Sequence, residues 1–325
     1  MIVDAHMHIF RAQDWNPPGQ KAAWESWARQ VRWYDMPLQQ AHQRYLEAAQ
    51  AVLDPDGSKT IARMDEAGVD VSVMMPMDRG LAHNDEGVVP IEEKNRGCYE
   101  LTQMHPGRLY SFCGVDPRRP FAVDMLRWGL KEGGMKGLKL YPTAGFYPDD
   151  EICYPLSRTC VEHDVPVLLH QGHSGGRLKS KYGHPIHLDT VAADFPELRI
   201  ILGHGARIET WGHEALSIAI YKTNVYIEIS LWQHWLSVDQ LLDQFIWIRD
   251  RIGIDRLLFG SDMTNMEVSM TLKEWVDIVK MLPEWAKQKG SRLSQQEIDL
   301  VLGGNAMRVY KLPAVGVTAH PVRTT

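Results

Sequence analysis

The feature that most constrains this fold is a short apolar run that recurs along the chain. Each run ends in a polar, Gly or Pro group, and several are followed by apolar residues spaced three and four apart, as in an amphipathic helix. After the first unit, the ends of successive runs lie roughly 25 to 40 residues apart, which is the size of one βα unit. We therefore predict eight strands, at 2–8, 69–76, 109–116, 135–142, 165–171, 198–204, 224–230 and 256–262.

Eight such units predict a (β/α)8 TIM barrel, whose parallel strands are buried on both faces and read as nearly continuous apolar runs. A barrel of this kind needs about 250 residues, and the chain has 325. We expect a single (β/α)8 domain at 1–312, a helical insertion at 10–57 after the first strand, and a C-terminal tail at 313–325. The insertion is expected to cover the barrel mouth with aromatic residues, namely Trp15, Trp24, Trp27, Trp33 and Tyr34.

Composition narrows the class of protein. The chain is 44% apolar and 23% charged, with a net charge of -6, which is ordinary for a soluble globular protein and argues against nucleic-acid or membrane partners. No segment approaches the roughly 18 to 20 apolar residues of a membrane span. The four cysteines form no CxxC pair, so we expect them to be reduced. We expect a cytoplasmic protein with a small-molecule substrate, and a homo-oligomer remains open.

The first strand, in MIVDAHMHIF, places three ionisable residues on one face. Residues two apart in a strand point to the same side, so Asp4, His6 and His8 would share a face. Burying three such groups is costly unless something pairs with them. A divalent metal ion is one such partner.

Further metal-ligand residue types stand at the ends of later predicted strands. In a (β/α)8 barrel the chemistry sits at the C-terminal ends of the strands, and there the sequence has His170, His204 and Asp262. Imidazole and carboxylate suit Zn²⁺ and its first-row neighbours. A single His at a strand end usually makes an ordinary hydrogen bond, so the prediction of a metal site rests on the whole set.

Two other charged residues lie within predicted strands. Lys139 could be a carboxylated lysine that bridges metal ions, but inward lysines in barrels also serve as charge partners, and we favour that role. Glu228 lies inside the seventh predicted strand, where we expect a structural partner of a neighbouring strand rather than a ligand.

With these residues in view, the chain resembles the amidohydrolase superfamily. The branch it resembles includes aminocarboxymuconate semialdehyde decarboxylase and related decarboxylases, hydratases and lactonases. The resemblance implies one divalent ion, with zinc preferred over manganese, held by His6, His8, His170 and Asp262. It also implies that His204 acts as an acid or base beside the metal-bound water or the substrate. The motifs that carry it are DAHMH (4–8), GLKLYP (137–142), LLHQG (168–172), ILGHGAR (201–207) and LLFGSD (257–262).

Such a site supports two reactions. In the first, Asp262 takes a proton from a metal-bound water and His204 stabilises the developing oxyanion or relays the proton. This would hydrolyse a small cyclic ester, a cyclic amide or a related carbonyl compound, and it is the reading that we prefer from sequence. In the second, the site decarboxylates an aromatic or unsaturated acid, and Asp262 or His204 protonates the carbon that loses CO2.

Substrate specificity is expected to come from residues that closely follow the strand ends. An arginine among them suits recognition of a carboxylate through two hydrogen bonds. Each residue could equally anchor a loop, and the aromatic residues of 15–34 could equally pack a lid. The candidates are Tyr141, His173, Arg177, Arg207, Trp232 and His234.

One motif points to a different enzyme. The stretch 172–176, GHSGG, fits G-x-S-x-G, the nucleophile elbow of α/β-hydrolases, and Asp262 and His320 follow Ser174 in the right order. That elbow must lead straight into a helix, and the following RLKSKYGHPIHL has no apolar periodicity. A serine hydrolase is therefore a minor alternative, as is a non-catalytic binding protein on a barrel scaffold.

Overall fold

Every strand pair is parallel in the computed structural model, which describes residues 1–11, 37, 39–40, 43, 53–84, 87, 89–263 and 270–313. The strands form a three-stranded sheet of order β1-β2-β3 and a six-stranded sheet that runs in order from β4 to β9. Their bounds are β1 Val3–Met7, β2 Val71–Met74, β3 Leu109–Ser111, β4 Cys113–Gly114, β5 Leu138–Leu140, β6 Val167–His170, β7 Ile200–Gly203, β8 Val225–Glu228 and β9 Leu257–Leu258.

The two sheets follow one another almost without a break. Only Phe112 separates β3 from β4, and its N–H donates to the Met74 carbonyl at 3.0 Å. Because of this residue the predicted third strand, 109–116, is two short strands, so the described residues form nine strands where eight were expected. The predicted α/β fold with parallel strands is confirmed.

Backbone hydrogen bonds also join the first strand to the segment that follows the last. The Ala5 N–H donates to the Phe259 carbonyl at 2.9 Å, and the Asp262 N–H donates to the His6 carbonyl at 2.9 Å. The two ends of the strand series are therefore neighbours, as a barrel requires.

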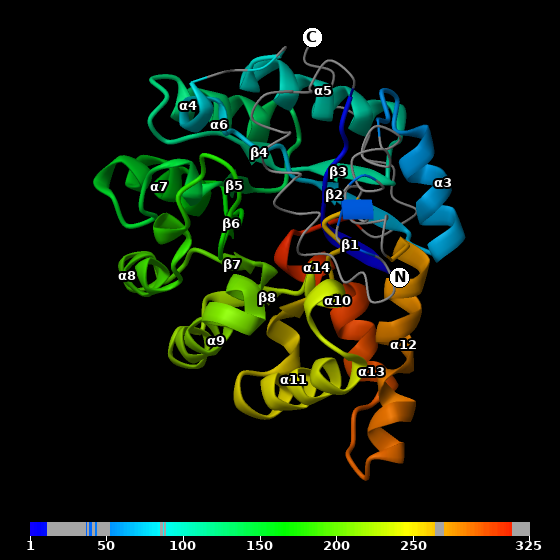
Figure 1. Ribbon diagram of the computed structural model, residues 1–325. Helices are drawn as coiled ribbons and strands as arrows, with labels where there is room; N and C mark the ends of the chain where they lie inside the picture. The colour runs from blue at the N-terminus through cyan, green and yellow to red at the C-terminus, as the bar shows by residue number, and fades with distance from the viewer. Residues whose placement is uncertain are drawn as a thin grey trace.

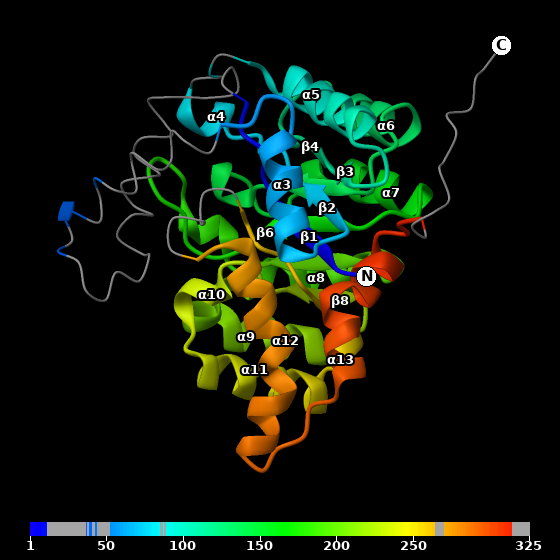
Figure 2. The same cartoon turned by 90° about the vertical axis from the view of Figure 1, so that its right-hand side faces the viewer.

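Helices lie on the outer side of the strands (Figure 1), and α3 packs beside α12 near the N-terminus (Figure 2). The α-helices are α3 Ser58–Ala67, α4 Gly80–His83, α5 Ile91–Met104, α6 Ala122–Lys131, α7 Tyr154–Glu162, α8 Ile186–Asp194, α9 Gly212–Tyr221, α10 Trp232–Trp235, α11 Val238–Arg251, α12 Leu272–Gln288, α13 Gln295–Asp299 and α14 Asn305–Val309. Short 3₁₀ or π turns are η2 Pro142–Ala144, η3 Glu151–Cys153, η4 Ser180–Gly183, η5 His204–Ala206, η6 Arg207–Trp211, η7 Ile254–Arg256 and η9 Leu300–Gly304.

Local sequence signals set where several helices begin. In α12, the Thr271 side chain accepts from the Glu274 N–H, and the Glu274 side chain accepts from the Thr271 N–H. The same reciprocal capping box starts α11 and α13. Each box satisfies backbone donors that the first helical turn would leave without partners.

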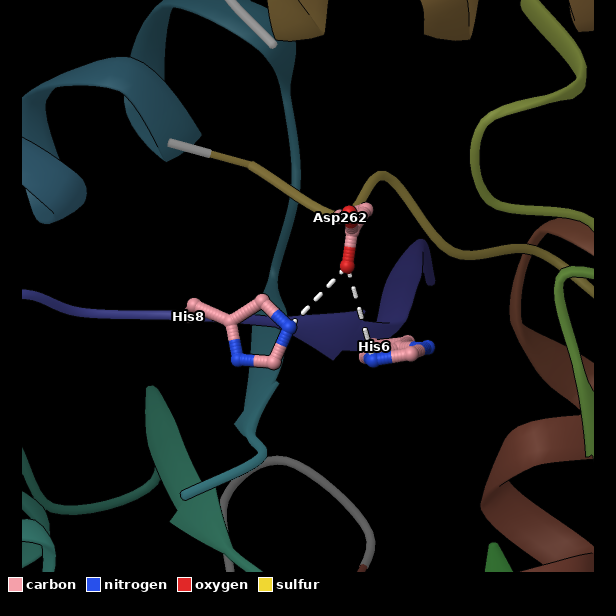
Figure 3. A group of neighbouring side chains, drawn as sticks. All are labelled: His6, His8 and Asp262. Carbon is pink, nitrogen blue, oxygen red and sulfur yellow. Dashed lines mark hydrogen bonds and ion pairs between the residues drawn. The ribbon is translucent and has the colours of Figure 1, made fainter. Parts of the chain in front are cut away.

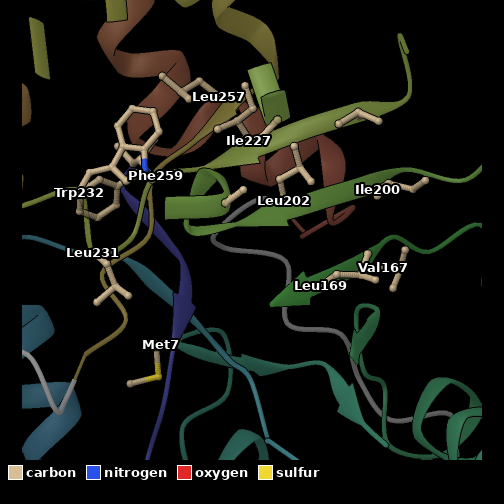
Figure 4. Packing of buried hydrophobic residues seen from close by; sticks show 14 of the residues in the cluster. Met7, Val167, Leu169, Ile200, Leu202, Ile227, Leu231, Trp232, Leu257 and Phe259 are labelled. Atoms are coloured by element: carbon tan, nitrogen blue, oxygen red, sulfur yellow. The ribbon is translucent and has the colours of Figure 1, made fainter. Parts of the chain in front are cut away.

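The strands bury apolar residues on both faces. Val167 and Leu169 of β6 pack with Ile200 and Leu202 of β7 in the larger core cluster (Figure 4). Leu168, which lies between the first two, belongs to a second cluster. Alternate residues of one strand thus serve two cores, as expected of parallel strands covered on both sides.

The elements after residue 270 pack against the strands. The Tyr310 hydroxyl donates to the Ala5 carbonyl at 3.1 Å, and its ring centroid lies 4.8 Å from that of Phe112. This contact ties the segment that follows α14 to β1 and to the junction between the two sheets.

Two predicted segments lie largely outside the described residues. Within the predicted 10–57 insertion, Phe10 forms an isolated parallel bridge with Leu53. The five aromatic residues predicted to cover the barrel mouth lie outside the described residues. Of the 313–325 tail, only residue 313 is described. None of the helices in the described part of the chain is long and apolar enough to cross a membrane.

Candidate metal centre and active site

Three of the predicted ligands converge. Strand β1 carries His6 and His8, and Asp262 follows β9. The Asp262 Oδ1 atom lies 3.0 Å from His8 Nε2 and 3.6 Å from His6 Nε2 (Figure 3). All three side chains are buried, and their ligand atoms lie within 4.8 Å of one another.

The partners of the two histidines determine which ring nitrogens carry hydrogen. His8 Nδ1 lies 2.7 Å from the Met75 carbonyl, so it must donate, and His6 Nδ1 lies 2.8 Å from Glu228 Oε2. In its neutral form each ring therefore has its Nε2 lone pair on the side of Asp262, and in that form His8 gives up its hydrogen bond to the carboxylate. Metal-binding histidines are usually oriented in this way by a carbonyl or carboxylate on the other nitrogen. Two imidazole nitrogens and one carboxylate oxygen therefore fit a divalent ion.

Asp262 is held in an uncommon backbone conformation, with φ of 56°. The buried Asp4 carboxylate accepts from the Ser261 hydroxyl at 2.6 Å and from the Ser261 N–H at 3.0 Å. The Met263 N–H donates to the same hydroxyl at 3.0 Å. These bonds on both sides fix the turn at Asp262, and thereby the position of its carboxylate.

The Asp262 carboxylate is ionised. Burial alone would raise its pKa, but the hydrogen bond with His8 and the neighbouring imidazole rings of His204 and His6 hold the pKa well below its usual range. The centre therefore has a fixed negative charge where a cation would bind.

His204 and His170 belong to a hydrogen-bonded chain beside this group. His170 Nδ1 lies 3.1 Å from His204 Nε2, and His170 Nε2 lies 2.9 Å from the Ser174 hydroxyl. His204 Nδ1 lies 2.7 Å from the Ser230 hydroxyl, and its ring stacks on His6 with centroids 4.9 Å apart. Burial lowers the pKa of His204 to about 3, so the ring is neutral.

His170, which the resemblance implies is a metal ligand, does not lie with the other three implied ligands. Both of its ring nitrogens have partners in His204 and Ser174, and it is not part of the group formed by His6, His8 and Asp262. To bind the same ion, His170 would have to release one of these hydrogen bonds.

Glu228 lies at the centre of the site. It accepts from His6, from the His204 N–H at 3.2 Å and from the Ser230 hydroxyl at 2.8 Å. With His6 and His204 it forms a second group whose geometry could hold a metal ion. Glu228 therefore contacts the site residues directly, and its geometry allows both a structural role and a role as a ligand. Sequence reasoning does not identify Ser230 as a site residue. The available signal is the spacing of two residues between Glu228 and Ser230, which is the same as that between His6 and His8.

Lys139 on β5 is buried in the same place. Its Nζ atom lies 3.1 Å from His6 Nε2, and the side chain is only 2% exposed. Burial lowers its pKa to about 8, while the negative charges of Asp262 and Glu228 oppose that shift.

Three of the six predicted specificity residues are buried beside these histidines. The Tyr141 ring stacks on His170 at 4.2 Å between centroids. The Trp232 indole N–H donates to the His204 carbonyl at 3.0 Å, so it anchors the loop after β7. Burial lowers the pKa of His234 to about 4, and the charge of Asp262 acts on it in the opposite direction.

The other three predicted specificity residues lie elsewhere. His173 is exposed and stacks on Trp211 with centroids 4.3 Å apart. Arg177 is exposed and donates to the His83 carbonyl at 3.1 Å. The Arg207 side chain lies outside the described part of the structure.

The nucleophile-elbow interpretation is wrong. Strand β6 ends at His170, and the stretch that follows Ser174 contains a turn and the short 3₁₀ element η4 instead of the required α-helix. The Ser174 hydroxyl bonds His170 and, at 2.9 Å, Thr143. His320, the third residue of that interpretation, lies outside the described residues.

Comparison of the whole fold with solved structures gives matches over nearly the full chain. A TIM-barrel protein of Bordetella bronchiseptica is 20% identical, with a TM-score of 0.66 over 96% of this chain and 98% of that chain. The 5-carboxyvanillate decarboxylase of Novosphingobium aromaticivorans, bound to manganese and 3-methoxy-4-hydroxy-5-nitrobenzoic acid, is 17% identical (TM-score 0.67, 96% and 97% covered). A dihydroxybenzoic acid decarboxylase of Polaromonas, bound to manganese and 2-nitroresorcinol, is also 17% identical (TM-score 0.64, 96% and 97% covered).

The sequence itself shows the family. None of the curated proteins compared with the chain matches it significantly. The family model described as amidohydrolase, however, matches residues 3–312, which is nearly the whole chain and includes every residue of the site. The chain therefore belongs to the amidohydrolase family.

Proposed function

We propose that the protein is a metal-dependent decarboxylase that releases CO2 from an aromatic or unsaturated carboxylic acid. The observation that carries this proposal is the buried group of His6, His8 and Asp262 in a fold similar to that of manganese-containing decarboxylases. Their bound ligands are substituted aromatic compounds. This reverses the order that sequence alone favours, in which hydrolysis comes first. Manganese is accordingly the first ion to test, and zinc the second.

The chain's own residues supply binding and proton transfer. His6, His8 and Asp262 would hold the ion, which supplies a Lewis acid for substrate oxygens. Decarboxylation needs a proton for the carbon that loses CO2. Since Asp262 is ionised and His204 is neutral, either can accept a proton from the substrate and return it to that carbon. Ser230 and His170 hold the His204 ring in place for this transfer.

Hydrolysis of a small cyclic ester or amide is the second candidate. The observation that favours it is the ionised Asp262 carboxylate beside the predicted ion, where it could take a proton from water.

A substrate panel tests the two candidates against each other. The manganese-loaded protein should release CO2 from at least one hydroxybenzoic acid and should leave cyclic esters intact. The measurements are CO2 release and product mass, with a His6→Ala, His8→Ala double variant as the inactive control. Ring opening of a lactone without CO2 release would instead establish the hydrolase.

A further inference from the structure

Lys139 makes a contact that a metal ion would disrupt. Its Nζ atom, 3.1 Å from His6 Nε2, is a donor, and the His6 nitrogen has a single lone pair because Nδ1 is engaged with Glu228. That same lone pair is one of those that fit the ion. The ammonium group and the ion cannot both use it.

The surroundings of Lys139 show where its charge acts. The side chain is buried, and the charges nearest to it are those of Asp262 and Glu228. Its own charge acts in turn on His6, His170 and His204. The ammonium group is thus surrounded by the site, and once it leaves His6 its donors remain beside the place where substrate oxygens would bind.

We propose that Lys139 is a specificity-determining residue that exchanges partners: metal binding frees its ammonium group from His6, and the group then binds the anionic oxygen of the substrate. The substrate half of this inference rests on the proposed function, because it takes the substrate to be a carboxylic acid. The metal half does not. A buried cation next to the ion also disfavours neutral ligands, because only an anion compensates both positive charges.

The first measurement is metal affinity, determined by manganese titration of the apoprotein. Lys139→Met keeps the length and burial of the side chain but removes the competing charge. We expect it to bind manganese at least about tenfold more tightly than the unaltered chain. The ammonium group and the ion would both lie next to His6 Nε2, and two positive charges that close repel strongly at low dielectric constant. Loss of manganese binding would overturn the proposal, and would show that Lys139 is itself a ligand through a carboxylated amine.

The second measurement is binding of benzoate and of its neutral analogue benzamide to the manganese-loaded proteins by calorimetry. The unaltered chain should prefer benzoate, and Lys139→Met should reduce that preference at least about tenfold, the loss expected for one charge-assisted contact. Equal binding of the two probes by the unaltered chain, or an undiminished preference in the variant, would overturn the proposal.

Lys136 offers a matched control. It lies two residues before β5 but is half-buried, and its Nζ lies 5.4 Å from the centre of the Tyr110 ring, away from the site. Lys136→Met should leave both measurements unchanged, and a shift equal to that of Lys139→Met would overturn the proposal. If Lys139→Met does not fold by circular dichroism, Lys139→Gln replaces it in both measurements.

Neither measurement uses turnover, so the two proposals can fail separately. Both shifts without CO2 release from any acid would refute the decarboxylase and leave the role of Lys139 standing. CO2 release with neither shift would do the reverse.

Discussion

Asp262 contacts or acts electrostatically on most of the ionisable residues of the site. Its carboxylate contacts His8 and lies near His6, and its negative charge acts on Lys139, His170, His204 and His234. An aspartate that follows a strand could also serve only as the N-cap of the next helix, because Asp is a favoured N-cap residue. In the structure the Asp262 carboxylate instead contacts His8. The first described helix after Asp262 begins at Leu272, and its N-cap is Thr271.

Replacement of Asp262 by Asn keeps the shape and one oxygen but removes the base. We expect metal binding to weaken without being abolished, and kcat to fall about 10²–10⁴-fold, the usual contribution of a positioned acid or base. The measurements are kcat, metal content and Tm on one preparation. Asp250→Asn, an exposed carboxylate paired with Arg249, is the matched control. A near-normal kcat with a lowered Tm would show that Asp262 only caps the chain.

At the scale of elements, the site depends on how closely β1, β8 and the segment after β9 approach one another. Gly260 is the point of contact. A Cβ atom there would lie 2.1 Å from Glu228 Oε1 and 3.0 Å from the Cβ of His6. The absence of a side chain at this position is therefore what allows Glu228 to reach both His6 and His204.

Gly260→Ala should displace Glu228 and disorder the site. Overpacking of this kind typically costs about 1–3 kcal/mol, and we expect a lower free energy of unfolding together with weaker manganese binding. Gly304→Ala is the control, since the atom closest to a Cβ there is the tip of the Leu300 side chain, at 3.1 Å. Chemical denaturation and metal titration check both variants. Unchanged metal affinity in Gly260→Ala would show that the position of Glu228 does not matter for metal binding.

Periodicity predicted the elements well, because an apolar run bounded by polar residues is a local property of the chain. It could not predict the division of the third strand at Phe112, which depends on a bond to Met74 in the neighbouring strand. It also could not assign partners. His170 meets His204 and Ser174, and Glu228 meets His6 from a distance of 222 residues in the chain. Such pairings follow from packing in three dimensions.

At the scale of the whole molecule, the centre concentrates charge in the interior. Asp262, Glu228 and Lys139 are all 2% exposed or less, and a bound divalent ion would compensate the carboxylates. Because ligands that bind only the folded state stabilise it, manganese at 100 times its dissociation constant should add about 2.7 kcal/mol to the free energy of unfolding.

Removal of the ion with a chelator should therefore lower Tm and abolish turnover, and both should return when manganese is added back. Thermal denaturation followed by calorimetry measures the first effect, and CO2 release measures the second. The His6→Ala, His8→Ala double variant provides the reference, because its Tm should not respond to manganese. Equal responses in both proteins would place the stabilising ion at another site.

The hydrogen bond between His8 and Asp262 spans 254 residues, and this has a consequence for synthesis on the ribosome. Strand β1 is made before β2 and can pair with it early, but its bonds to Phe259 and Asp262 form only after the segment that follows β9 has left the exit tunnel. Domains generally fold as units, and here β1 completes its pairing only when the segment after β9 is available. A nascent chain that stops before Asp262 lacks one of the three converging ligands, so all three can hold the ion only after β9 and the residues that follow it have been made.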